Sequence, residues 1–133
     1  MSVARALSLF FAAGALGGVA NSVAIWLFGQ LGFTHALGVA IAPALSPSWL
    51  YPRIVWGGIW GILFALPSPT GWLKRGLVLS LGPSLVQLFV VFPVRGHQGL
   101  LGLELGLLTP LFVLFFNAVW GASASWWLRC TRS

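Results

Sequence analysis

Amide and hydroxyl side chains interrupt the apolar stretches of this sequence, and they are its first candidates for chemistry. A side-chain amide surrounded by hydrocarbon loses its water and needs hydrogen-bond partners within the protein. We expect at least two of the three amides to face the interior of a helix bundle and to approach one another or a serine hydroxyl. Such a cluster would serve either as a structural cross-link or as the lining of a permeation path. This candidate midplane cluster comprises Asn21, Ser84, Gln87 and Asn117.

Charged side chains form a second candidate set, at the expected outer face of the molecule. The set comprises Arg53, Arg95 and Glu104. Glu104 is the single acidic residue, against seven basic ones. A carboxylate is favoured at a helix N-terminus, and Glu104 stands at the expected start of the last helix. We predict that it pairs with Arg95 or Arg53, the alternative being a solvated glutamate.

The residue types needed for common enzyme mechanisms are missing. A single carboxylate excludes catalysis by paired acids and a carboxylate-rich metal site. A Ser–His–Asp triad is excluded because the chain has no Asp. Cys130 stands alone, and His35 and His97 are far apart, so no pair has the spacing of a zinc site. We expect a protein that is not an enzyme and that holds no metal or cofactor.

The composition is that of a membrane protein. Hydrophobic residues make up 59% of the 133 residues and charged residues 6%, against about 25% charged residues in soluble domains. The mean hydropathy is +0.97, and the apolar stretches are continuous rather than alternating, which favours helices over a β-barrel. The net charge of +6 then indicates topology signals and lipid headgroup contacts. We expect a lipid bilayer as partner and no nucleic acid.

Four transmembrane helices in a single all-α domain, residues 1–133, account best for these stretches. We expect them at about 7–28, 49–66, 76–92 and 105–128, with the third kinked at Pro83 and ending at Pro93. Five basic residues then share one side of the membrane, namely Arg5, Lys74, Arg75, Arg129 and Arg132. Arg53 and Arg95 fall on the other side. The positive-inside rule therefore predicts that both termini are cytoplasmic.

The connection between the first two helices, residues 30–52, is too apolar for an ordinary loop. We expect a short interfacial helix from Ala36 to Ala42, stopped by Pro43 and Pro47. A re-entrant segment is the alternative, because irregular backbone inside a membrane must line a cavity or be buried in protein.

Small residues four positions apart occur in three of the expected helices. They are Gly14 and Gly18, Gly57 and Gly61, and Gly121 and Ser125. Such pairs let helix backbones approach closely in a membrane. They predict a tight bundle, and they also favour self-association or membership of a larger membrane complex.

Part of the chain resembles small bacterial inner-membrane proteins of the YagU type. The resemblance rests on Gln87-Leu88-Phe89-Val90 followed by Phe92-Pro93, on the Gly/Ala-rich first helix and on the Trp of the fourth helix. It covers about a third of the chain. It implies a multi-pass helix bundle in the bacterial inner (cytoplasmic) membrane and no particular activity.

Three functional hypotheses follow from these observations. The first is a non-enzymatic accessory or scaffold subunit, or a homo-oligomer. The alternative is a small oligomeric channel or transporter with a polar midplane patch. The third is pigment or lipid binding through Trp56, Trp60 and the two histidines.

Overall fold

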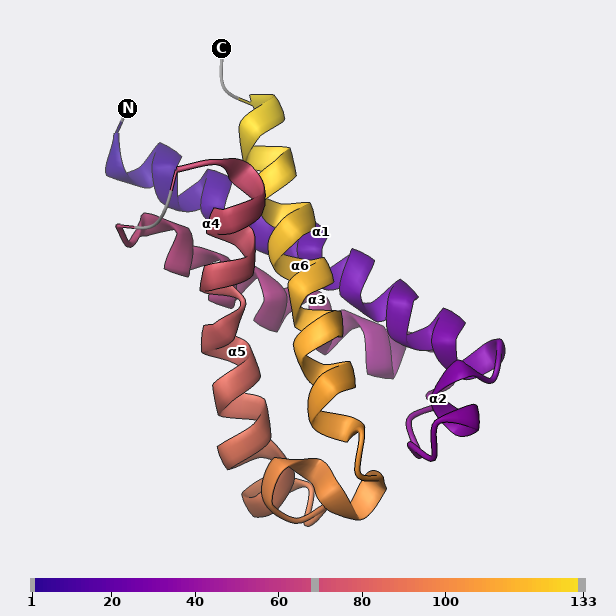
Figure 1. Cartoon of the computed structure of the whole chain (residues 1–133). Helices are drawn as coiled ribbons and strands as arrows, with labels where there is room; N and C mark the ends of the chain where they lie inside the picture. Colours follow the sequence, from indigo (N-terminus) through magenta and orange to yellow (C-terminus); the bar gives the residue numbers. More distant parts are fainter. Residues whose placement is uncertain (1, 68–69, 132–133) are drawn as a thin grey trace.

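The computed structural model describes residues 2–67 and 70–131, and all regular structure within them is helical (Figure 1). The element order is α1 (Val3–Gln30), α2 (Phe33–Ala36), α3 (Pro47–Gly61), η1 (Ile62–Ala65), α4 (Trp72–Leu79), α5 (Leu81–Val86), η2 (Gln87–Arg95), η3 (Leu100–Leu105) and α6 (Thr109–Thr131). The segments η1 and η3 are 3₁₀-helices, and η2 is a π-helix. The expected all-α fold class is confirmed for the described residues.

Three helical segments within the described residues are long and apolar enough to cross a membrane. They are Val3–Gln30, Trp72–Arg95 and Thr109–Thr131. The expected span at 49–66 coincides with a 15-residue α-helix, α3, followed by the four residues of η1, and it is not one of these three segments. Pro47 in the first turn of α3 and Pro67 just after η1 limit the segment.

The ends of the long helices differ from the sequence-based bounds. The third segment continues past Pro93 to Arg95, because Gly96 N–H and Gln98 N–H bond back to Val91 O and Phe92 O, each at 2.8 Å. The last helix begins at Thr109 rather than at residue 105. Gly106, which has a φ of 150°, separates the 3₁₀-helix η3 from this helix.

The third segment is interrupted near its middle, in the turn before Pro83. The helix breaks at Ser80, between α4 and α5. Pro83 lacks an N–H group and crowds the preceding turn, which is the physical cause of such breaks. Two serine hydroxyls donate hydrogen bonds to backbone carbonyls around the break. Ser84 Oγ donates to Ser80 O at 2.8 Å, and Ser80 Oγ donates to Leu77 O at 2.7 Å.

The helices α1 and α3 cross at their glycines. A Cβ placed on Gly57 would lie 3.0 Å from the Cα of Gly18, and one on Gly61 would lie 2.9 Å from the Cα of Gly14. Trp120 of α6 closes this crossing, because its Nε1 donates to Gly14 O at 3.1 Å and to Gly57 O at 3.3 Å. The two GxxxG pairs therefore pack against each other within one chain.

A second close approach joins α4 to α6. A Cβ on Gly121 would collide with the backbone carbonyl of Gly76 and lie 3.1 Å from Ser80 Cβ. Ser125, the other member of the small-residue pair, is also buried. The small residues of all three motifs thus serve packing inside the molecule.

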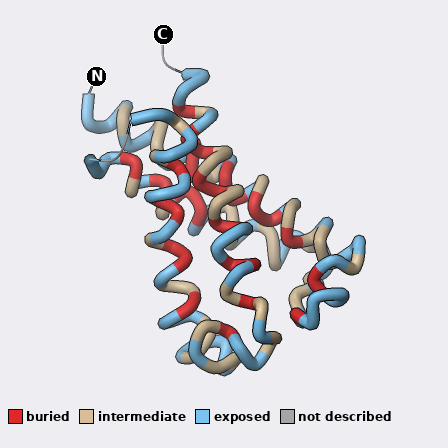
Figure 2. Tube along the Cα trace, viewed as in Figure 1, coloured by how far each residue is buried: buried red, intermediate tan, exposed pale blue. Residues whose placement is uncertain are grey.

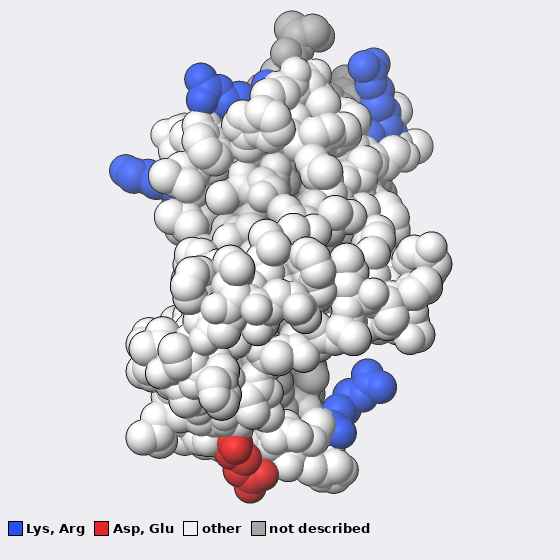
Figure 3. All heavy atoms as spheres, turned by 90° about the vertical axis from the view of Figure 1, so that its right-hand side faces the viewer, with Lys and Arg blue, Asp and Glu red and all other residues white. Residues whose placement is uncertain are grey.

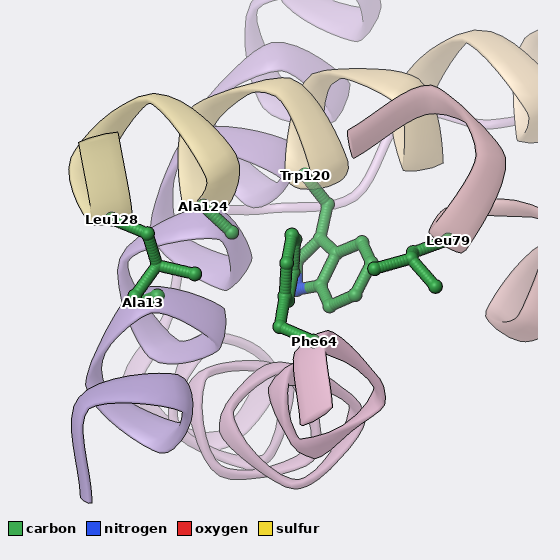
Figure 4. Packing of buried hydrophobic residues seen from close by; sticks show 6 residues of the cluster. All are labelled: Ala13, Phe64, Leu79, Trp120, Ala124 and Leu128. Carbon is green, nitrogen blue, oxygen red and sulfur yellow. The ribbon is translucent and has the colours of Figure 1, made fainter. Parts of the chain in front are cut away.

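Two apolar clusters form the core. The first joins four helical segments around Phe64 and Trp120, whose ring centroids lie 5.9 Å apart (Figure 4). The second gathers Ile25, Val39, Phe112 and Phe116. Figure 2 shows buried residues on the inward sides of the helices and exposed ones outside. Many of the outward residues are large and apolar, as Leu85 and Leu111 are, which suits contact with lipid.

The two ends of the chain lie at the same end of the molecule (Figure 1). In Figure 3 most Lys and Arg side chains on the visible face gather at this end, and the single acid, Glu104, lies at the opposite end. The basic end and the acidic end are therefore separated along the length of the helical bundle.

Candidate solute-binding cavity

A hydrogen-bonded chain of polar groups links α3, α1 and α6. Arg53 Nη2 donates to Asn21 Oδ1 at 2.6 Å, and Arg53 Nε donates to Ser22 Oγ at 3.0 Å. Asn21 Nδ2 in turn donates to the Phe116 carbonyl at 2.7 Å. Asn21 is therefore satisfied on both sides of its amide, and it holds the guanidinium in one position.

A second polar group links α6 to the α5–η2 segment. Asn117 Nδ2 lies 3.2 Å from Ser84 Oγ and 3.3 Å from Gln87 Oε1. Ser84 and Asn117 are buried, and Gln87 is partly buried. The structure thus brings together three of the four residues of the candidate midplane cluster. The fourth, Asn21, bonds to the backbone of Phe116, the neighbour of Asn117.

A cavity of about 420 Å³ lies between these two polar groups. Its polar lining consists of Asn21, Arg53, Gln87 and Asn117. Its apolar lining includes Ile25, Trp49, Phe92, Val113 and Phe116. The helices α1, α3 and α6 and the π-helix η2 all contribute, so the cavity lies between α3 and the three candidate spanning segments.

The segment after α2 supplies one wall of this cavity. The expected helix over 36–42 is wrong: the helical turn ends at Ala36, and the chain from Val39 to Pro43 has no regular secondary structure. Gly38 has a φ of 75° and ends the turn. Thr34 Oγ1 donates to Ile41 O at 2.8 Å, and Ala40 N–H donates to Leu105 O at 2.9 Å. The irregular backbone is therefore bonded to α2 and to η3, and it lines a cavity.

The π-helix η2 begins at the cavity wall. Gln87 is its first residue, and Phe92 lies on the same wall one π-turn later. A π-helix advances i to i+5, and such turns occur frequently at functional sites. The wider turn brings Gln87 and Phe92 to the same cavity, which the regular α-helical spacing expected for 76–92 did not predict.

Arg53 belongs to the cavity rather than to an outer-face charge cluster. Its guanidinium carbon lies 4.8 Å from the ring centroid of Trp49, four residues earlier in the same helix. Within the described residues, its third nitrogen, Nη1, has no hydrogen-bond partner. The expected pairing with Glu104 is wrong, because Asn21 and Ser22 hold the guanidinium on α1.

In the described part of the chain, Glu104 does not pair with Arg95 either. It is exposed, and in the described part of the chain no ion pair within 4.0 Å involves its carboxylate. It lies in η3, where its N–H donates to Gln98 O at 3.0 Å and its side chain packs over Gly99. The alternative of a solvated glutamate fits this position, although Glu104 does not open a helix.

The candidate sets predicted from the sequence assign Arg53 to the outer-face charges and include neither Ser22 nor Trp49, which contact it in the structure. Two signals were present. Arg53 falls inside the expected span 49–66, and an arginine within a span is a functional candidate by default. Trp49 and Arg53 are four residues apart, which puts them on one helix face.

The remaining candidates lie away from the cavity. His35, His97 and Cys130 are exposed. Trp56 has 58% of its surface exposed, and Trp60 packs partly against the Phe64–Trp120 cluster. None of these side chains lines the cavity.

No family model, curated protein or solved structure matches this chain.

Proposed function

We propose that this chain is a small membrane transporter or channel that binds a polar solute in the 420 Å³ cavity among α1, α3, α6 and η2. One observation carries the proposal: an arginine and three side-chain amides line a single cavity between α3 and three segments that are long and apolar enough to span a membrane. Ionisable and polar residues at this depth mark substrate pathways in membrane proteins. Small-molecule sites of this kind combine apolar walls with a few placed polar groups.

The proposed topology has four spans with both termini in the cytoplasm. The segments α3 and η1 together extend about 30 Å, taking 1.5 Å per residue for 15 α-helical residues and 2.0 Å for four 3₁₀ residues. That length matches the bilayer core of about 30 Å. An even number of crossings agrees with chain ends on one side, and the basic residues at that end favour the cytoplasm. Arg132 lies outside the described residues.

Residues 37–46 act as a re-entrant segment in this proposal. They satisfy the condition for irregular backbone at membrane depth, because Ala40 to Pro43 line the cavity. The bond from Ala40 N–H to Leu105 O ties this segment to the loop before α6. The outer mouth of the pathway is then formed by residues 37–46 and the loop before α6, which both face away from the cytoplasm.

The transporter hypothesis ranks above the scaffold or homo-oligomer hypothesis. The small-residue pairs that favoured self-association are filled by contacts within the chain, at the α1–α3 crossing and at the α4–α6 contact. They no longer indicate a partner. The bacterial inner membrane stays the expected location, on the strength of the YagU-type resemblance.

Accessibility of a cysteine to water-soluble reagents tests the proposal. Cys130 is the single cysteine, so Cys130→Ser gives a thiol-free background. In that background Val113→Cys places a thiol on the cavity wall, and Leu114→Cys places one at the same depth on the outer surface of α6. We expect small methanethiosulfonate reagents to modify Cys at 113 from both sides of sealed vesicles. A thiol in lipid stays protonated and unreactive, so Cys at 114 should resist.

The outcomes separate conduction from binding. Reaction from one side only would reject conduction and leave a binding protein. No reaction from either side, with Cys130 of the unmodified chain reacting normally, would reject the solute cavity altogether.

A further inference from the structure

Among the described residues, the charge of Arg53 has no counter-charge. The sequence contains one acidic side chain, Glu104, and it is exposed and unpaired among the described residues. The groups that contact Arg53 are neutral: the Asn21 amide, the Ser22 hydroxyl and the Trp49 ring. A desolvated charge is unfavourable unless it is paired. A bound anion would supply the missing charge.

The guanidinium is held so that part of it is available to a ligand. Asn21 Oδ1 and Ser22 Oγ accept from Nη2 and Nε, which fixes the plane of the group. Within the described chain, no acceptor reaches Nη1. Gln87 likewise uses its Oε1 toward Asn117 while its Nε2 has no described partner. Two N–H donor groups therefore line the same cavity without acceptors.

The size and walls of the cavity select among anions. A volume of about 420 Å³ is near the low end for small-molecule sites and far above that of a halide ion. Trp49, Phe92 and Phe116 supply apolar wall next to the donors. An arginine fork matches a carboxylate or a phosphate geometrically. The fitting ligand has an oxyanion head and a small apolar body.

We infer that the cavity is a site for a small organic anion, whose carboxylate or phosphate head binds Arg53 Nη1 and Gln87 Nε2 and whose apolar body lies against Trp49 and Phe116. Asn117 Oδ1, which has no described donor, accepts from water or from a hydroxyl on the ligand. The inference rests on the proposed function, because it names the solute class for that same cavity.

Protection of the cavity cysteine tests the anion. The Cys130→Ser, Val113→Cys chain is reconstituted in phosphatidylcholine vesicles and modified with the neutral reagent methyl methanethiosulfonate. Benzoate is the probe, and benzamide is its uncharged counterpart of the same size. We expect benzoate to slow the modification by about tenfold or more, as one charge-assisted contact allows, and benzamide to leave the rate unchanged.

Three further substitutions assign the effect to the site. Arg53→Gln removes the charge and should abolish protection by benzoate. Gln87→Glu keeps Arg53 but adds an internal carboxylate, which should occupy Arg53 and also abolish protection. This second variant keeps the test valid if Arg53→Gln fails to fold. Arg95→Gln removes an exposed arginine outside the cavity and should leave protection unchanged.

Vesicle composition distinguishes a free solute from a lipid headgroup. With phosphatidylglycerol in the vesicles, slower modification in the absence of benzoate would identify the lipid headgroup as the occupant. An unchanged rate would identify a free anion. Equal protection by benzamide and benzoate, or full protection in Arg53→Gln, would overturn the inference while the solute cavity stands. A cysteine at position 113 that never reacts would overturn both the anion inference and the proposed solute cavity.

Discussion

Arg53 and Asn21 are joined by a hydrogen bond of 2.6 Å from Nη2 to Oδ1, across 32 positions of sequence and two helices. Asn21 lies nine residues before the end of α1 at Gln30, which is about 14 Å at 1.5 Å per residue. The bond therefore holds a positive charge well inside the helical bundle. Because Asn21 also donates to the Phe116 carbonyl, one amide ties three helices together around the cavity.

Replacing Asn21 should be strongly destabilising. Asn21→Leu removes the acceptor of the partly buried Arg53 Nη2 and leaves Phe116 O without this donor, so we expect a loss of about 1.5–3 kcal/mol, the range for hydrogen bonds to charged groups. Thermal unfolding in detergent, followed by loss of the monodisperse peak, measures the change. Ser8→Ala, at an exposed position of the same helix, is the matched control. An unfolding temperature equal to that of the control would contradict the role given to Asn21.

A charged replacement of similar size, Asn21→Asp, tests whether Arg53 lacks a counter-charge. A carboxylate at this position would pair with Arg53 directly and provide its counter-charge. The carboxylate cannot donate to the Phe116 carbonyl as the amide does, so we expect stability above that of Asn21→Leu but not above that of the parent chain, together with loss of benzoate protection at residue 113. Retained protection would show that the anion does not depend on the free charge of Arg53.

Replacing Asn117 distinguishes a structural role of the midplane cluster from a role in the solute pathway. Its contacts to Ser84 and Gln87 are 3.2 and 3.3 Å long, so Asn117→Leu should cost only about 1 kcal/mol, as interhelical hydrogen bonds in membranes do. Uptake of benzoate into proteoliposomes should fall in this variant, because a polar group of the cavity lining is lost. Its elution profile should stay that of a folded protein. Unchanged uptake with reduced stability would assign the cluster to structure alone.

The glycine crossing of α1 and α3 should not tolerate a methyl group. A Cβ on Gly14 would lie 2.7 Å from Gly61 Cα and would also strike the Gly57 carbonyl. Backbone atoms cannot move aside cheaply, so Gly14→Ala should destabilise the fold by about 1–3 kcal/mol, the usual range for overpacking. Gly96→Ala is the control, because its Cβ would meet atoms no closer than 3.4 Å. Similar thermal stability of the two variants would mean that the crossing is loose.

The topology can be read with reporters fused to the chain. A reporter at the C-terminus, and one inserted in the loop before Trp72, should signal cytoplasm, because the basic residues gather at that end. A reporter inserted between Gly96 and Gly99 should signal the opposite side. A non-cytoplasmic C-terminus would refute the orientation, and the same signal from both loops would refute the crossing between them.

Several features of this protein could be predicted from the sequence because they depend on local properties. Long apolar stretches require helices in a membrane, since backbone polar groups must bond within the segment. The meeting of Asn117 with Ser84 and Gln87 follows from their similar depth and from the scarcity of polar partners in hydrocarbon. GxxxG pairs predicted close backbone contact, and Pro83 predicted a break in the third segment.

Other features depend on which helices meet and at what register, and only the tertiary structure decided them. The sequence does not say that Gly14 and Gly18 face Gly57 and Gly61 of the same chain rather than of a second copy. Nor does it place Arg53 beside Asn21, because that contact depends on the level at which α3 crosses α1. The cavity combines residues from helices, a π-turn and a connection without regular structure. Hydrophobicity and spacing are properties of one segment, whereas a cavity is a property of the space left between several.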